Sequence, residues 1–141
     1  MTRMDTNKEL VYAKEVYAIV GAAMEVHNTF GAGAAEAIYQ ESMEIELGLR
    51  GIPFERQKQL KVVYKGVTLQ CEFVADLVCF GAIIVEIKAI EKLLPIHDAQ
   101  VLSYLRLTRK KVGLLMNFHV PVLKDGLKRI VNEFPDSASR R

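Results

Sequence analysis

Two apolar segments on either side of Gly81 constrain the fold of this chain more than any other feature, because each is interrupted by a carboxylate. Residues 74–78 read VADLV and residues 83–88 read IIVEIK. Nearly continuous apolar runs of this kind are typical of strands buried on both faces. Since Gly81 supplies a turn between them, we expect an antiparallel hairpin with strands at 67–80 and 82–89.

The register of this hairpin brings two acids together. If residues equidistant from Gly81 face each other, Asp76 lies opposite Glu86, with about 5 Å between their Cβ atoms. Strand alternation sorts the neighbours into faces, with Asp76 beside Val74 and Val78, and Glu86 beside Ile84 and Lys88. The sequence therefore predicts a carboxylate pair with one lysine close by.

Burying two like charges costs several kcal/mol unless something compensates for them. A divalent cation would compensate directly, because carboxylate oxygens suit Mg²⁺ and Mn²⁺. The alternative is a surface hairpin in which Lys88 contacts Glu86, since an isolated Glu-x-Lys is common. The apolar context disfavours that alternative, because acids rarely occupy buried strands without a partner.

The rest of the chain predicts a mixed α/β domain. Three- and four-residue apolar spacing predicts helices at 7–28 and 34–49, with the segment 30–33 breaking them apart. Further elements are a strand with alternating Leu60, Val62 and Tyr64, a turn at 65–66, a helix at 96–108, a strand at 112–118 and a strand or helix at 127–131. A meander followed by a crossover helix and another strand is the expected order.

Spacing also predicts which side chains are buried. The expected core face of the first helix contains Leu10, Ala13, Val16, Tyr17, Val20, Met24 and His27, and that of the second contains Ile38, Ile45 and Leu49. Cys71 and Cys79 fall on the strand face opposite Asp76, where we expect small buried hydrophobes.

Composition excludes several classes of protein. A length of 141 residues fits one domain, 1–141, with an ordered core at about 7–134. No apolar run approaches the roughly 20 residues of a membrane span, and the polar N-terminus lacks a secretory signal. Two cysteines provide neither a disulfide framework nor a four-ligand zinc site, so we expect a cytoplasmic protein.

The net charge of +2 conceals a division along the chain. Residues 1–100 carry 10 basic and 14 acidic side chains, whereas residues 101–141 carry 9 basic and 3 acidic ones. Such an asymmetry is typical of chains that bind an acidic polymer at their basic end. A charge run is also commonly only a solvated face, and the sequence leaves both interpretations open.

Several ordered motifs together resemble one protein family. Asp76 followed by Glu86-Ile87-Lys88 resembles the metal site of the PD-(D/E)XK nuclease superfamily. Residues 33–39, GAAEAIY, resemble the signature of its GxxExxY branch. The flanking motifs agree: VH at 26–27, QVLSYL at 100–105 and GLLMNF at 113–118. The resemblance spans roughly residues 17–131, and it departs at Ala32, where a proline is usual.

The resemblance implies both a fold and an activity. The fold is an α/β restriction-endonuclease-like core, a central mixed sheet flanked by helices in the order αβββαβ, with an extra N-terminal helix. The activity is metal-dependent hydrolysis of phosphodiester bonds in nucleic acid, with DNA favoured. Catalytic roles fall to Glu36, Asp76, Glu86 and Lys88. Mg²⁺, with Mn²⁺ as a substitute, would bind Asp76, Glu86 and the backbone carbonyl of Ile87, with Glu36 as a further candidate.

The resemblance also suggests a substrate surface. The candidates that it brings in are Tyr39, His97, Gln100, Tyr104, Arg106, Lys110 and Lys111. Structural roles compete with these assignments. Glu36 can stabilise the dipole at its helix N-terminus, Tyr39 can belong to the core, and Gln100 and Tyr104 can form an ordinary polar helix edge.

A rival function stays open at this point. The chain can be a nucleic-acid-binding module with weak or no catalysis, although the complete set of Asp76, Glu86 and Lys88 argues against that. Homodimerisation is implied by resemblance alone. The sequence does not separate DNA from RNA, internal from terminal cleavage, or single strands from duplexes.

Overall fold

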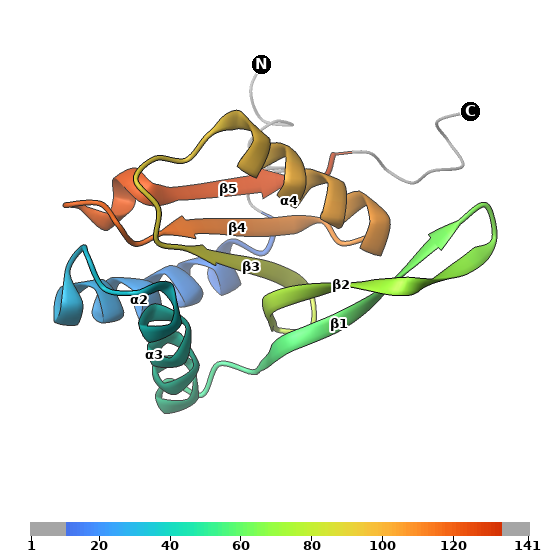
Figure 1. The fold of residues 1–141 in the computed structure, drawn as a ribbon. Helices are drawn as coiled ribbons and strands as arrows, with labels where there is room; N and C mark the ends of the chain where they lie inside the picture. The colour runs from blue at the N-terminus through green and yellow to red at the C-terminus, as the bar shows by residue number, and fades with distance from the viewer. Residues whose placement is uncertain (1–10, 134–141) are drawn as a thin grey trace, which may run out of the picture.

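The computed structural model describes residues 11–133, and within them the chain forms a five-stranded sheet in the order β1-β2-β3-β4-β5 (Figure 1). Strands β3 and β4 are parallel, and every other neighbouring pair is antiparallel. The elements are α2 (Ala13–Phe30), α3 (Glu36–Leu49), β1 (Phe54–Tyr64), β2 (Val67–Cys79), β3 (Ile83–Lys88), α4 (Pro95–Thr108), β4 (Val112–Asn117), the 3₁₀ turn η1 (Leu123–Gly126) and β5 (Leu127–Val131).

The predicted fold class is confirmed, with a mixed sheet flanked by helices. Residues 127–131, which the sequence left open, form a strand that pairs with β4. Strand β1 begins at Phe54, earlier than the alternation at Leu60 suggested, because it pairs with β2 from Phe54 opposite Cys79 onward. The first helix begins at Ala13, and residues 7–10 of the predicted helix lie outside the described residues.

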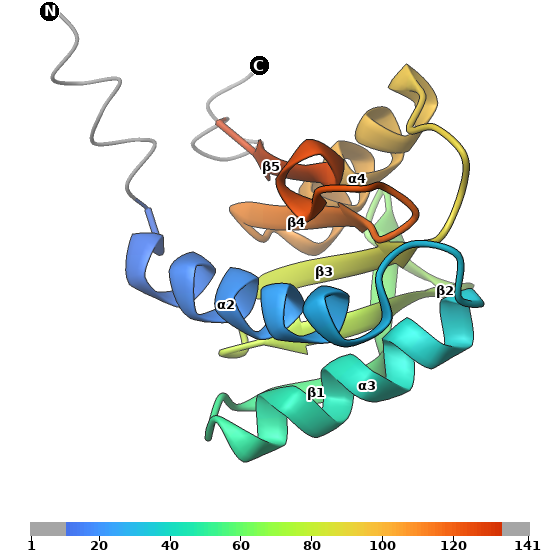
Figure 2. The same cartoon turned by 90° about the vertical axis from the view of Figure 1, so that its left-hand side faces the viewer.

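Two apolar layers enclose the sheet. Helices α2 and α3 cover one face, where Ile19, Met43 and Leu47 pack on Val85 and Ile87, while α4 covers the other (Figure 2). Strand β3 alternates cleanly, so its odd-numbered residues face α2 and α3 and Ile84 faces α4. None of the helices between residues 11 and 133 has the length and hydropathy needed to cross a membrane.

The predicted core face of the first helix is confirmed at His27, which is buried, and at Val16, which packs against the core, but it is wrong at Tyr17, which is 82% exposed. The predicted face of the second helix is wrong, because Ile38, Ile45 and Leu49 of α3 are all exposed. The other buried positions are Ile19, Ala22, Ala23 and Val26 in α2, and Tyr39, Met43 and Leu47 in α3. Small alanines let α2 approach the sheet closely, and the Tyr39 ring stacks on Phe118 at 4.6 Å. Packing partners rather than hydropathy alone therefore choose the buried face.

The alternation of β2 breaks at Asp76. Ala75 and Val78 both pack in the cluster beneath α4, whereas Leu77 packs beneath α2 and α3. On the neighbouring strand, Gln57 has a φ of 46° and separates two regular ladder pairs, Arg56–Leu77 and Lys58–Ala75. The expectation of one continuous alternation through Asp76 is therefore wrong, because a local kink shifts its phase.

The two cysteines differ in burial. Cys79 is buried as predicted, and burial raises the pKa of its thiol to about 12. Cys71 is exposed, contrary to expectation, because the outer part of the β1–β2 hairpin extends beyond the helices that cover the sheet (Figure 1).

The contact between α4 and β4 makes a glycine necessary. A Cβ at Gly113 would lie 2.7 Å from Val101 Cγ1 and 3.5 Å from Leu105 Cδ1. We expect Gly113→Ala to lower the free energy of unfolding by about 1–3 kcal/mol, because overpacking displaces α4. The matched control is Gly48→Ala in α3, where no atom lies within 4 Å of the added Cβ. Urea unfolding should show the control unchanged or stabilised by up to about 1 kcal/mol, and equal stability of the two variants would contradict the packing.

Candidate active site

The backbone ladder between β2 and β3 stops where the two acids begin. The regular pairs are Leu77–Val85, Val78–Ile84 and Cys79–Ile83, in the register that symmetry about Gly81 predicts. Beyond them, side chains take over from the backbone. The Ile87 N–H donates to Asp76 Oδ2 at 2.8 Å, and the Asp76 N–H donates to Glu86 Oε2 at 3.3 Å. Each carboxylate therefore fills a place where a strand carbonyl would otherwise accept.

Burial makes this acid pair resist ionisation. Burial is the largest cause that raises the pKa of Glu86 to about 8; the charges of Asp76 and Glu36 also raise this pKa, whereas the Asp76 N–H and the charge of Lys88 lower it. Burial also raises the pKa of Asp76, whereas the hydrogen bond from the Ile87 N–H and the charge of Lys88 lower it. Two half-buried carboxylates this close favour a bound proton or a cation between them.

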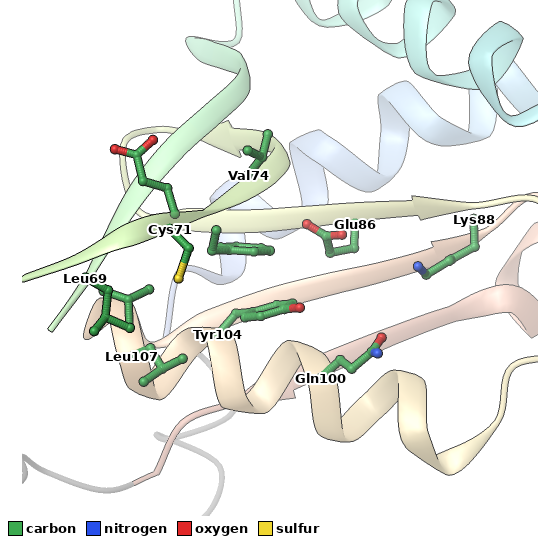
Figure 3. Close-up of a pocket in the computed structure, with 11 residues that line it drawn as sticks. Leu69, Cys71, Val74, Glu86, Lys88, Gln100, Tyr104 and Leu107 are labelled. Atoms are coloured by element: carbon green, nitrogen blue, oxygen red, sulfur yellow. The ribbon is translucent and has the colours of Figure 1, made fainter. Parts of the chain in front are cut away.

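A groove of about 530 Å³ opens beside the pair, between β2 and α4 (Figure 3). Glu86 and Lys88 point into it from β3, and Gln100 and Tyr104 approach from α4. The structure thus brings together four of the residues that the sequence singled out. The full lining is Val62, Leu69, Cys71, Glu72, Phe73, Val74, Glu86, Lys88, Gln100, Tyr104 and Leu107.

Phe73 is a groove residue that sequence reasoning missed. Its ring stacks on Tyr104 with centroids 3.7 Å apart and 18° between the ring planes. Strict alternation from Asp76 would assign odd-numbered residues of β2 to the face of Leu77, away from α4. Because of the phase shift at Asp76, strand alternation did not predict Phe73 as a groove residue.

Helix α3 holds the back of the site. Gln40 Nε2 donates to the Asp76 backbone carbonyl at 3.2 Å and to Glu44 Oε2 at 2.8 Å. Glu44 in turn accepts from Arg56 Nε at 3.0 Å, on β1 beside Gln57. Gln40 was not among the predicted site residues, and the signal for it was its position four residues after Glu36, on the same helix face.

Glu36 is the first residue of α3 and is exposed. Its charge contributes to the raised pKa of Glu86, which places it within electrostatic reach of the pair. Across residues 11–133, however, no three His, Cys, Asp or Glu side chains are grouped closely enough to enclose a metal ion. The carboxylates that contact each other's strands are Asp76 and Glu86, and carboxylate oxygens are the ligands that hard cations prefer.

Two of the predicted substrate contacts have structural roles. Tyr39 is fully buried, and its hydroxyl donates to the Gly31 carbonyl at 2.5 Å and accepts from the Ala34 N–H at 3.1 Å. This geometry fits the core-packing alternative, so we leave Tyr39 out of the substrate surface. His97 Nδ1 accepts from the Leu94 N–H at 2.8 Å and caps the first turn of α4.

The basic residues after α4 lie away from the acids. Lys110 Nζ donates to the Gly81 carbonyl at 3.3 Å, at the turn between β2 and β3. Lys88 is at the other end of β3, a separation of about 16 Å for a six-residue strand. Lys111 follows Lys110, and Arg106 is exposed on α4 but does not line the groove. The structure therefore does not bring Lys110 and Lys111 to the acid pair.

Comparison with known proteins gives one strong match. The sequence profile described as the PD-(D/E)XK nuclease superfamily matches residues 13–130. No significant match was found among curated proteins. A solved structure titled "Crystal structure of SSO0001" is similar at 20% identity and a TM-score of 0.41, with 92% of this chain covered. The chain spans 64% of the length of that structure.

The raised pKa of Glu86 predicts how stability depends on pH. In the range between its usual 4.5 and about 8, the folded state binds more protons than the unfolded state. Stability of the metal-free protein should therefore fall as pH rises through this range, by an amount on the order of a few kcal/mol. In Glu86→Gln the fall should be smaller, because the amide is neutral at every pH.

Urea unfolding in EDTA at pH 5 and pH 9 measures this difference. The control is Glu91→Gln, at an exposed position in the connection to α4, which should behave like the wild type. Identical pH profiles for Glu86→Gln and the wild type would show that Glu86 is not held in its protonated form.

Proposed function

The chain belongs to the PD-(D/E)XK nuclease superfamily, and on that premise we propose that it is a metal-dependent nuclease acting through Asp76, Glu86 and Lys88. The observation that carries the proposal is the pair of carboxylates that replaces the β2–β3 ladder, with Glu86 of the pair lining a groove. We assign the chain to the GxxExxY branch of the superfamily on residues 33–39, and we propose DNA as its substrate.

The acid pair supplies the ligands for the metal. Asp76 and Glu86 would hold Mg²⁺ or Mn²⁺ together with the Ile87 carbonyl. The N–H and C=O of one strand residue point toward the same neighbouring strand, and the Ile87 N–H already bonds to Asp76. When bound, the ion would lower the pKa of a water molecule and neutralise charge on the phosphate.

The remaining side chains orient the substrate and stabilise charge. Lys88 would place its ammonium against the phosphate, where it offsets the negative charge that develops during hydrolysis. Gln100 and Tyr104 line the opposite wall, and the Gln100 amide and the Tyr104 hydroxyl would hold the nucleic-acid backbone. Gln40 fixes the Asp76 backbone from behind and so keeps the carboxylate in place.

The turn formed by residues 31–35 determines where helix α3 begins. Gly33 has a φ of 103°, a conformation that favours glycine, and the turn that contains it is closed by the Tyr39 hydroxyl. Glu36 is the first residue of α3, and its charge contributes to the raised pKa of Glu86. We propose that Glu36 orients water at the edge of the metal site.

The proposal predicts cleavage of DNA that requires Mg²⁺ or Mn²⁺ and stops in EDTA. Asp76→Asn and Glu86→Gln should each lower the rate at least about 100-fold, because each removes a charged ligand. Lys88→Met should lower it by about 100- to 1,000-fold through lost charge stabilisation. Gel analysis of a labelled oligonucleotide measures these rates, with Glu91→Gln as a control that retains activity.

A second readout separates metal binding from catalysis. Mn²⁺ should raise the melting temperature of the wild type and of Lys88→Met, but not that of Asp76→Asn, because a ligand that binds the folded state stabilises it. Cleavage that persists in Asp76→Asn would overturn the proposed site. Salt-dependent DNA binding with no cleavage under any metal would instead identify a binding module without catalysis.

A further inference from the structure

The groove beside the acid pair has two ends of different chemistry. At one end Glu86, Lys88 and Gln100 present charged and polar groups (Figure 3). At the other end the wall consists of Leu69 and Val62 from the β1–β2 hairpin and Leu107 from α4. Tyr104 lies between the two ends (Figure 3), and the Phe73 ring stacks on it. Any ligand that spans the groove must therefore change from polar to apolar along its length.

The charges indicate which end a phosphate occupies. Among the described residues that line the groove, Lys88 is the one cation, and it lies beside the acids. Glu72 also lines the groove, but its carboxylate pairs with Lys61 Nζ at 2.5 Å. No cation belongs to the lining at the apolar end, and the nearby Lys61 ammonium is already paired with Glu72, so desolvating a phosphate there would be costly. The sugar–phosphate backbone is thus favoured at the Lys88 end alone.

The apolar end fits the face of a base. Nucleobases have flat apolar faces that stack on aromatic rings and pack against aliphatic side chains. Phe73 and Tyr104 are both partly exposed and provide an aromatic platform next to Leu69 and Leu107. A cavity of about 530 Å³ is within the range of small-molecule sites, which is ample for one nucleoside.

A paired base does not offer such a face. In a duplex the faces of each base are covered by its stacked neighbours, and only the edges reach the grooves. Single strands can turn their bases outward onto protein side chains. The lining of the groove therefore discriminates between the two forms of nucleic acid by what each can present to it.

We propose that the apolar end, formed by Val62, Leu69 and Leu107, and the adjoining rings of Phe73 and Tyr104 together hold one unpaired base of the strand whose phosphodiester lies at Asp76 and Glu86. The substrate is then single-stranded nucleic acid. This inference rests on the proposed function for the position of the phosphodiester. The observations that carry it are the segregated charge and the aromatic–aliphatic wall of one continuous groove.

Binding in EDTA tests the inference without cleavage. The probe is a 20-residue DNA oligonucleotide with 2-aminopurine at its centre, used as a single strand and as a duplex, with an RNA strand of the same sequence beside it. We expect the DNA single strand to bind about 10-fold tighter than the duplex by fluorescence anisotropy. The emission of its 2-aminopurine should also change on binding, because the base exchanges its stacked neighbours for the groove wall.

Matched variants locate the base. Leu69→Ser and Leu107→Ser should each weaken single-strand binding about 10-fold and leave duplex binding unchanged. Their controls are Val67→Ser on the same strand and Ile96→Ser on the same helix, which are exposed apolar residues outside the groove and should bind as the wild type does. Unfolding curves identify any variant that fails to fold. Leu107→Met keeps the groove wall apolar, so it should fold and should bind the single strand as the wild type does.

The outcomes separate this inference from the proposed function. Equal affinity for single strand and duplex, or equal loss in the groove and control variants, overturns the unpaired-base site even if the protein cleaves DNA. Groove-dependent binding of the single strand supports the site. If such binding occurs without cleavage in Mg²⁺ or Mn²⁺, the proposed function fails while the base site stands. Equal binding of RNA and DNA strands supports recognition of the base alone.

Discussion

The substitution of side-chain carboxylates for backbone carbonyls between β2 and β3 is the constraint on which the site depends. Three regular pairs close the hairpin, and then Asp76 and Glu86 each accept an N–H from the opposite strand. This arrangement leaves the edge of β3 near Ile87 without ladder partners on β2, yet keeps the strands together. A continuous backbone ladder would make the fold more stable, and an acid pair on the surface would cost less desolvation free energy.

Several neighbouring features keep that arrangement in place. The left-handed conformation of Gln57 lets β1 follow the kink in β2, and the chain of hydrogen bonds from Arg56 through Glu44 and Gln40 ties both strands to α3. Beneath the strands, Leu77 and Val78 pack in opposite layers and prevent the hairpin from sliding. The acid pair is therefore fixed by packing from two sides and by polar contacts from a third.

The sequence predicted those parts of the site that local rules determine. A glycine turn and two apolar strands fix a register, so the contact between Asp76 and Glu86 was predictable, as was the polar edge of α4 with Gln100 and Tyr104. The kink was not predictable, because a glutamine such as Gln57 does not indicate a positive φ. Most buried positions of α2 and α3 also escaped prediction, since both helices carry apolar residues all round and tertiary packing selects among them. The predicted position of Lys110 near the acids was wrong for a simpler reason: the residues that follow α4 lie at the end of β3 that is distant from Lys88.

The Tyr39 hydroxyl bonds to the backbone on both sides of the turn before α3, and Tyr39 is not among the residues that line the groove. Gly33 and Tyr39, the glycine and tyrosine of residues 33–39, therefore maintain the shape of a loop. The carboxylates of the candidate site lie on other elements, on β2 and β3. A chain that retains the glycine and tyrosine but has lost Asp76 or Glu86 would keep the same turn without the carboxylate pair, so a match to this segment alone identifies a fold before it identifies an activity.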